Sequence, residues 1–196
     1  EKLEGGLKNV IKKCHECGMK FGLWFEPEMI SEDSSLYQAH PDWCIHVPNV
    51  SPCKSRQQLV LDFSNPAVVR YIKKVVGSIL EENEISYVKW DMNRNITECF
   101  SVYLDTERQQ ELMHRYILGV YDLAEYLTST FPNVFFEGCS GGGGRFDPAM
   151  LYYFPQIWTS DNTDAVSRAY IQYGTSLCYP LSAMSGHVSI CPNHQN

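Results

Sequence analysis

The sequence lacks the features of several protein classes. No apolar run approaches the roughly 20 residues that span a bilayer, and the first residues, EKLEGGLKNV, lack the apolar core of a signal peptide. The 16 Lys and Arg residues are scattered among 23 Asp and Glu, for a net charge of -7, so we expect no nucleic-acid or anionic-membrane surface. These absences predict a cytoplasmic protein with a polar, neutral partner.

Cysteine is plentiful, but the pattern of a disulfide or metal framework is missing. A chain of 196 residues with 44% hydrophobic content can build a core without needing its 8 cysteines as cross-links. Cys14 and Cys17 form a C-x-x-C pair, yet no second pair follows at zinc-site spacing. We expect mostly free thiols in a reducing compartment, with no metal and no cofactor.

Strand and helix signals alternate along the chain. The pattern predicts helices at residues 3–17, 66–83, 106–127 and 165–173, and strands at residues 20–26, 85–90, 134–137, 156–160 and 178–184. The first of these strands reads as buried, and a long polar excursion, Pro27 to Gln58, follows it. This alternation implies a parallel sheet with helices packed outside it.

The residues at the strand ends favour a closed barrel over an open sheet. Glu26, Asp91, Cys139 and Asp161 come at or just after strands, and a TIM barrel collects the carboxyl ends of its strands into one site. A complete barrel needs eight strands and about 250 residues, however, and only about five strands are visible. We expect an α/β fold in which residues 1–196 are one partial TIM (β/α)8 barrel domain, roughly its third to seventh strands.

The stretch YVKWDMNRN, Tyr87 to Asn95, is the first candidate for chemistry. Lys89 lies two residues before Asp91 and therefore points to the same side of the strand, where its charge would keep the carboxylate ionised. An ionised, positioned aspartate is a nucleophile or a general base. The alternative is a surface ion pair between Asp91 and Arg94.

A second carboxylate comes from IWTSDNTDA, Ile157 to Ala165. Asp164 sits at the start of a predicted helix and is interpreted as its cap, which leaves Asp161 for chemistry. Two carboxylates that converge on one pocket are what glycoside cleavage requires, one ionised to attack the anomeric carbon and one protonated to help the leaving oxygen depart.

The glycine run in EGCSGGGGR, Glu137 to Arg145, matches neither common phosphate motif. A P-loop needs Lys and then Ser or Thr after its last glycine, but Arg145 and Phe146 follow here. We expect instead a loop whose missing side chains let backbone amides and Cys139 approach a ligand. Four tryptophans near strand ends are either platforms for a sugar ring or packing residues: Trp24, Trp43, Trp90 and Trp158.

Motifs along nearly the whole chain resemble those of the family 36 glycoside hydrolases, the bacterial and fungal type of α-galactosidase. They are FGLWFEPEMIS, HPDW, QLVLDFSNP, KWDMNR, EGCSGGGGRFDPAMLYYFPQIWTSDNTDA and HVSICPNHQ. The resemblance implies a TIM-barrel catalytic domain and retaining hydrolysis of terminal α-D-galactosyl residues from sugars such as melibiose and raffinose. It also implies that Asp91 is the nucleophile and Asp161 the general acid/base.

The same resemblance implies which residues contact the substrate, and it shows which features of the family this sequence does not contain. By position, the sugar would meet the following residues: Trp24, Arg56, Lys89, Asn93, Cys139 and Gly141. The family's tandem aspartates on an earlier strand, its last barrel strand and its flanking β domains have no counterpart, so the segment alone is expected to be inactive. The full-length protein is expected to form a homo-oligomer, a tetramer by resemblance.

Two other functions remain open at this point. One is a non-catalytic carbohydrate-binding or inactive barrel fragment, which would not need both Asp91 and Asp161. The other is a close relative that acts on α-N-acetylgalactosaminides or transfers galactose. A phosphate-dependent barrel enzyme that uses Gly141 to Gly144 ranks last.

Overall fold

The computed structural model of the protein describes residues 5–189, which form two compact units. The first, here called the sheet unit, comprises residues 5–25, 85–93 and 133–189. The second, here called the helical unit, comprises Glu26–Glu84 and Arg94–Pro132.

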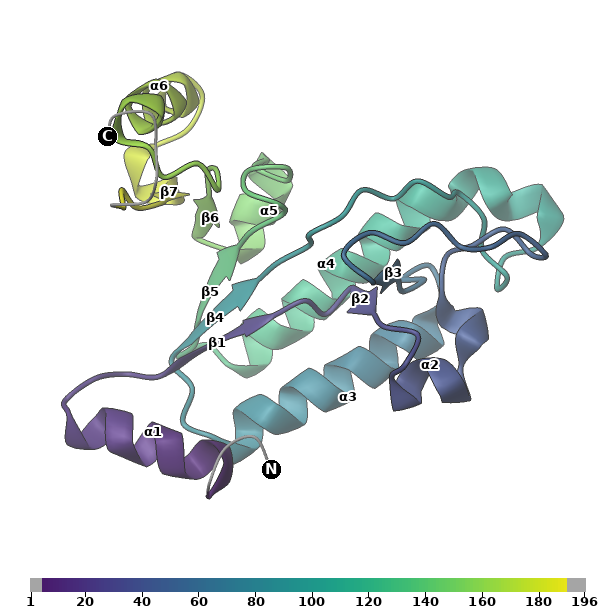
Figure 1. Cartoon of the computed structure of the whole chain (residues 1–196), viewed down its shortest axis with the longest axis horizontal. Coiled ribbons are helices and arrows are strands. Elements are labelled where there is room, and N and C mark those ends of the chain that lie inside the picture. The colour runs from purple at the N-terminus through teal and green to yellow at the C-terminus, as the bar shows by residue number, and fades with distance from the viewer. Residues whose placement is uncertain (1–4, 190–196) are drawn as a thin grey trace. The chain divides into compact units, whose positions relative to one another are not determined.

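The sheet unit is built on five parallel strands (Figure 1). They are β1 (Gly22–Phe25), β4 (Tyr87–Trp90), β5 (Phe135–Gly138), β6 (Gln156–Trp158) and β7 (Met184–Ser185), in the order β1-β4-β5-β6-β7. The predicted parallel α/β sheet is therefore confirmed.

One face of this sheet carries the core of the unit. Val88 and Trp90 of β4 alternate with polar residues, and both are buried with 1% exposure. Phe154 is also buried, and its ring lies 5.4 Å from that of Trp90 and 6.1 Å from that of Phe136. Since side chains alternate along a strand, this apolar packing directs the intervening residues to the other face.

Three α-helices belong to the sheet unit: α1 (Gly6–Glu16), α5 (Pro148–Tyr153) and α6 (Ala165–Ser176). Helix α1 ends before Gly18, whose φ of +70° suits a residue without a side chain, as predicted. Helix α5 was not predicted. Its signal is the Asp147-Pro148 pair, in which Asp147 accepts hydrogen bonds from the amides of Ala149 and Met150.

Two predictions about strands are wrong. Residues 178–184 form a turn and the 3-10 helix η3 (Leu181–Ala183), and strand β7 begins only at Met184. Pro180 interrupts the apolar run, because proline has no N–H for a strand ladder. Strand β1 is not buried, since it pairs on one side only within the described sheet and Trp24 is 49% exposed.

The helical unit contains two long helices that lie side by side, α3 (Pro66–Glu82) and α4 (Leu112–Thr130) (Figure 1). The side chain of Asn65 caps α3 by accepting from the amide of Ala67, and proline takes the first helical position, as predicted. The 3-10 helix η2 (Thr106–Glu111) leads into α4. Gly119 of α4 faces the chain at Phe63 so closely that a Cβ would lie 2.1 Å from the Phe63 carbonyl oxygen.

The polar excursion also lies in the helical unit. It contains the short helix α2 (Ser35–Ala39), the 3-10 helix η1 (Pro41–Trp43) and β2 (Met29–Ile30), which pairs antiparallel with β3 (Leu59–Val60). Just after β3, the buried carboxylate of Asp62 fixes the chain that follows the excursion. It accepts hydrogen bonds from the amide and hydroxyl of Ser64 and from the hydroxyl of Ser101. Residues 1–4 and 190–196, including the predicted helix start at Leu3, lie outside the described residues.

Candidate functional site

Strand register gathers the candidate residues on one face of the sheet. Trp24, Lys89 and Glu137 are directly paired across β1, β4 and β5. Asp91 and Cys139 follow two residues later on their strands, so they point to the same side. The face opposite the apolar core is therefore polar and aromatic. We call it the polar face.

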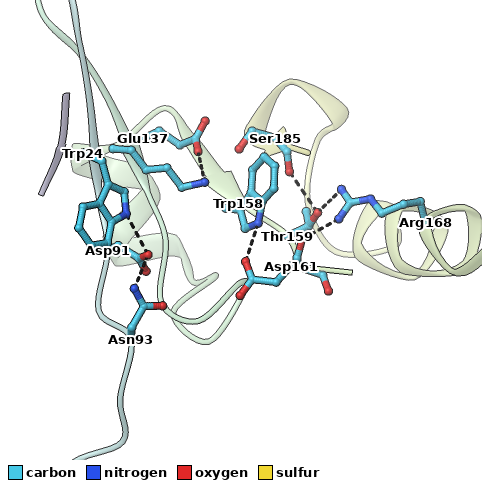
Figure 2. A network of polar contacts seen from close by, with 11 residues as sticks. Trp24, Asp91, Asn93, Glu137, Trp158, Thr159, Asp161, Arg168 and Ser185 are labelled. Carbon is cyan, nitrogen blue, oxygen red and sulfur yellow. Dashed lines mark hydrogen bonds and ion pairs between the residues drawn. The ribbon is translucent and has the colours of Figure 1, made fainter. Parts of the chain in front are cut away.

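Asp91 is held in place by two donors at the end of β4 (Figure 2). Its Oδ2 accepts from the indole Nε1 of Trp24 at 3.1 Å and from the amide Nδ2 of Asn93 at 2.6 Å. The residue is only 6% exposed, which rules out the alternative of a solvent-exposed surface pair. Its other oxygen, Oδ1, is buried and has no hydrogen-bond partner within residues 5–189.

Lys89 does not have the partner that the sequence indicated. Its Nζ lies 3.4 Å from Oε1 of Glu137 and 3.7 Å from the ring centroid of Trp158. Glu137, 5% exposed, was not singled out from the sequence, because only the register of β4 with β5 reveals the pair. Lys89 is thus fixed by an ion pair and a cation–π contact.

Arg94 makes contacts other than the ion pair that the alternative interpretation gave it. Its guanidinium donates to the carbonyl oxygens of Cys53 and Gln58, both at 2.8 Å, and so holds together parts of the helical unit. It is a structural arginine rather than a partner for Asp91.

The four tryptophans divide between the two predicted uses. Trp90 is a core residue, and Trp43 stacks on His40 in the helical unit with ring centroids 4.0 Å apart. Trp24 and Trp158 instead belong to the polar network drawn in Figure 2. Of these two, Trp24 is 49% exposed and keeps the accessible aromatic surface that a sugar platform needs, whereas Trp158 is half-buried and has Lys89 over its ring.

Asp161 follows β6 and is linked to the same network. Its Oδ1 accepts from the indole Nε1 of Trp158 at 3.0 Å (Figure 2). The Nζ of Lys89 lies over the ring of the same tryptophan. Asp161 is exposed, whereas Asp91 is buried, so the two carboxylates occupy different environments.

Asp164 is the helix cap that the sequence predicted. Its side chain accepts from the amide of Ser167 at 2.9 Å and so begins α6. The carboxylate of Asp161, three residues earlier, has no such role in the helix.

The glycine run approaches the chain around Asp161. A Cβ on Gly142 would lie 3.0 Å from Cα of Ser160 and 3.2 Å from the amide of Asp161, and Gly142 has a φ of +86°. A Cβ on Gly143 would lie 2.6 Å from the Thr159 carbonyl oxygen. These glycines are needed for loop packing. Gly141, with φ +52° and no neighbouring atom within 4 Å of a built Cβ, is the open position of the run.

Cys139 is a neutral thiol on the polar face. Burial raises its pKa to about 12, and the nearby Asp91 carboxylate contributes to the rise. The thiol therefore stays protonated near neutral pH and acts as a weak hydrogen-bond donor rather than as a nucleophile. All cysteines within residues 5–189 are free thiols, and Cys191 lies outside this range.

Arg56 belongs to the helical unit. It adopts a φ of +54°, and its side chain lies 3.9 Å from Glu26, to which it forms an ion pair. Its side chain is 57% exposed, so the guanidinium keeps donors for a ligand.

The described chain lacks two features. No group of three or more His, Cys, Asp or Glu residues within residues 5–189 is arranged to hold a metal ion. In the same range, no helix has the length and apolar character needed to cross a membrane.

Comparison with known proteins places the chain in a family. Alpha-galactosidase AgaA of Geobacillus stearothermophilus is 59% identical over 194 residues, which are 99% of this chain and 27% of that protein. Its crystal structures include a doubly substituted variant in complex with raffinose, with a TM-score of 0.93 and 58% identity over 97% of this chain and 26% of that one. Another variant, in complex with stachyose, has a TM-score of 0.94 and 58% identity over 97% and 27%.

The chain spans about a quarter of the length of these relatives. The model of the Melibiase family matches residues 1–196, the full sequence. The parallel α/β sheet with its two carboxylates is therefore part of such a protein, and the chain belongs to the Melibiase family.

Proposed function

We propose that the natural protein containing this segment is a retaining α-galactosidase. It hydrolyses terminal α-D-galactosyl residues of raffinose- and melibiose-type oligosaccharides by double displacement. The observation that carries this proposal is the Asp91 carboxylate. Two donors hold Oδ2 in place, while no N–H or O–H group within the described chain donates to Oδ1, and the Cys139 thiol is at most a weak donor to this carboxylate. Such an oxygen is oriented and has a free lone pair for attack.

The substrate class rests on the relatives. AgaA variants, 58% identical to this chain, bind raffinose and stachyose, both α-galactosides. A different aspartate is substituted in each complex, and the separation of the two along AgaA equals that of Asp91 and Asp161 here. This agreement supports Asp91 and Asp161 as the catalytic pair.

The first step forms a covalent intermediate. Oδ1 of Asp91 attacks the anomeric carbon, and the bond from that carbon to the departing oxygen breaks. Asp161, in its protonated form, donates its proton to the departing oxygen. The products are a β-galactosyl ester of Asp91 and the free sugar that carried the departing oxygen.

The second step restores the enzyme. Asp161, now ionised, takes a proton from water as that water attacks the anomeric carbon, and the ester bond to Asp91 breaks. Because the configuration is inverted twice, the released sugar is α-galactose. The scheme uses no metal and no cofactor.

The remaining site residues would bind the sugar. Trp24 offers an exposed aromatic surface beside Asp91, and Lys89 and Asn93 offer donors to ring hydroxyls. We assign Cys139, Gly141 and Arg56 to the sugar edge by position in the family motifs.

The wider organisation of the protein is also a proposal. Five parallel strands alternating with helices support a partial (β/α)8 barrel, the third to seventh strands, as the single domain of residues 1–196. The flanking strands and β domains would come from the rest of the natural chain, which we propose is a cytoplasmic tetramer. Free thiols throughout the described chain support a reducing compartment.

The test is hydrolysis of an aryl α-galactoside by the longest natural chain that contains these residues, beside its Asp91→Asn variant. The anomer released first is read by proton NMR. We expect α-galactose from the parent and a loss of turnover of roughly 10⁴-fold or more in the variant. The matched control is Asp122→Asn, an exposed aspartate on α4 of the helical unit, which we expect to keep the parent rate.

Either of two results would overturn the proposal. One is β-galactose as the first product, and the other is a folded full-length protein without hydrolysis. The second result would favour a non-catalytic carbohydrate-binding role.

A further inference from the structure

A buried arginine contacts the loop that carries Asp161. Arg168 of α6 is 2% exposed, and its Nη1 donates to the carbonyl oxygens of Ser160 at 2.9 Å and Asn162 at 3.4 Å. These two residues flank Asp161 on either side. The guanidinium therefore holds the backbone on both sides of the proposed acid/base. Figure 2 shows Arg168 next to Thr159 and Asp161.

The same guanidinium reaches one residue further back. Its Nη2 donates to Oγ1 of Thr159 at 2.7 Å, and that hydroxyl donates to the carbonyl of Ser185 on β7 at 3.1 Å. Nε donates to the side chain of Gln172 at 3.3 Å. These acceptors are all neutral. The planar guanidinium, with its fixed donor directions, therefore holds the loop in one conformation and does not neutralise a carboxylate.

Space for the guanidinium comes from a glycine. A Cβ built on Gly186 would lie 1.7 Å from Nη2 and 2.6 Å from the guanidinium carbon of Arg168. Any larger residue at Gly186 would have to displace the guanidinium from the loop. Substituting either Gly186 or Arg168 should therefore disrupt the same contact between the guanidinium and the loop.

The loop is also closed on another side. Gly142 packs so closely that a Cβ would lie 3.0 Å from Cα of Ser160 and 3.2 Å from the amide nitrogen of Asp161, so a side chain there would push on the loop backbone. With the guanidinium donating to its carbonyls, the loop has little freedom to move. Its carboxylate is directed by the hydrogen bond from Trp158.

We propose that Arg168 is a positioning residue for Asp161, fixing residues 159–162 so that the Asp161 carboxylate reaches the departing oxygen, and that Gly186 provides the space for it. This inference rests on the proposed role of Asp161. Arg168 itself does not touch the substrate. General acid catalysis depends on hydrogen-bond reach, so a small shift of the loop would impair proton donation selectively.

The test compares two substrates in the full natural chain. One is an aryl α-galactoside with an acidic phenol, which departs without a proton, and the other is raffinose, whose sugar leaving group needs one. In Arg168→Met we expect kcat/KM for raffinose to fall about 100-fold and for the aryl substrate less than about 3-fold. Arg168→Lys, which keeps a charge but not the fork, should recover part of the loss.

A second variant tests the same contact with the arginine intact. Gly186→Ala should displace the guanidinium and give the same selective loss for raffinose. The same-helix control is Tyr170→Ala, a 76% exposed residue of α6, which should behave like the parent with both substrates. The amplitude of the initial burst of phenol, compared with the enzyme concentration, gives the fraction of intact sites in each variant. This fraction corrects the rates of any variant that folds poorly.

Double variants separate positioning from a general structural role. Adding Arg168→Met to Asp161→Ala should cost less than about 3-fold more with raffinose, because both changes remove the same function. Equal losses for both substrates, a burst reduced in step with activity, or full additivity with Asp161→Ala would each overturn the proposal.

The failure of the proposed function gives a different result. If Asp161→Ala itself shows no preference between the two substrates, the acid/base assignment fails. If Asp161→Ala shows the selective loss and neither Arg168→Met nor Gly186→Ala does, only the positioning role fails.

Discussion

The ammonium nitrogen of Lys89 lies 3.4 Å from the carboxylate of Glu137, on the neighbouring strand and at the same level of the sheet. Glu137 is 5% exposed and the Lys89 side chain 22% exposed, so water has only partial access to the ion pair. The proposed sugar contact of Lys89 therefore depends on a residue that makes no proposed contact with the sugar.

Glu137→Gln should weaken substrate binding more than it slows chemistry. The amide keeps the shape of the side chain but removes the charge that holds the ammonium, so we expect KM for an α-galactoside to rise about tenfold, about 1.4 kcal/mol, with kcat changed less. Steady-state kinetics on the full natural chain checks this. The control Glu81→Gln changes an exposed carboxylate on α3, and an equal rise there would contradict the prediction.

Asp161→Ala should be rescued by azide. Azide needs no general base, so it should attack the β-galactosyl ester of Asp91 from the face that water uses and release α-galactosyl azide. We expect turnover of an activated aryl substrate to rise at least about tenfold with added azide, and the product is identified by NMR. If galactose remains the only product and the rate is unchanged, Asp161 is not the general base.

Two helical glycines should respond to alanine in opposite directions. Gly119→Ala places a Cβ 2.1 Å from the Phe63 carbonyl oxygen, so α4 must shift and the free energy of unfolding should fall by about 1–3 kcal/mol. Gly174→Ala, in α6, meets nothing within 4 Å and should be neutral or stabilising by up to about 1 kcal/mol. Chemical denaturation of both variants checks the contrast, and the same sign for both would refute it.

Alkylation should distinguish buried from exposed thiols. Burial raises the pKa of Cys44 and Cys139 to about 12, so at pH 8 only about one thiol in 10⁴ is ionised at each. Iodoacetamide should therefore modify the exposed Cys17 and Cys178 and spare the buried pair in the folded protein, as read by peptide mass spectrometry. Rapid modification of Cys139 at pH 8 would contradict the burial argument.

The same shifts predict a direction for stability. A thiol whose pKa is raised by folding favours the native state only while the unfolded thiol is neutral. The contribution of Cys44 and Cys139 is therefore full below about pH 8.5 and falls as the pH rises toward 12. We expect the free energy of unfolding to decrease as the pH rises above about 8.5. In a Cys44→Ser variant this decrease should be smaller.

Local signals in the sequence predicted local structure. The Asn65-Pro66 pair marks the start of α3, and Asp164 caps α6, because a cap acts within three residues of itself. The parallel sheet followed from the alternation of strands and helices. The predicted strand at 178–184 failed because its apolar content resembles a strand while Pro180 prevents one.

Contacts between distant residues were not visible in the sequence. Glu137 pairs with Lys89 only through the register of two strands, and Arg168 reaches the carbonyls of Ser160 and Asn162 only because of the direction that α6 takes. A buried arginine that donates to carbonyls has no sequence motif. The candidate carboxylates, together with Trp24 and Asn93 beside Asp91, could be named from the sequence, whereas the roles of Glu137 and Arg168 required the structure.

The alternation of side chains along β4 limits how this part of the gene can change length. Val88 and Trp90 point into the core, and Lys89 and Asp91 point to the polar face. Inserting or deleting one codon within the strand would exchange the two sets, burying a charge and exposing an indole at once. Changes in length are therefore expected only in the connections between strands, where substrate preference can diversify while the two faces of the sheet stay in phase.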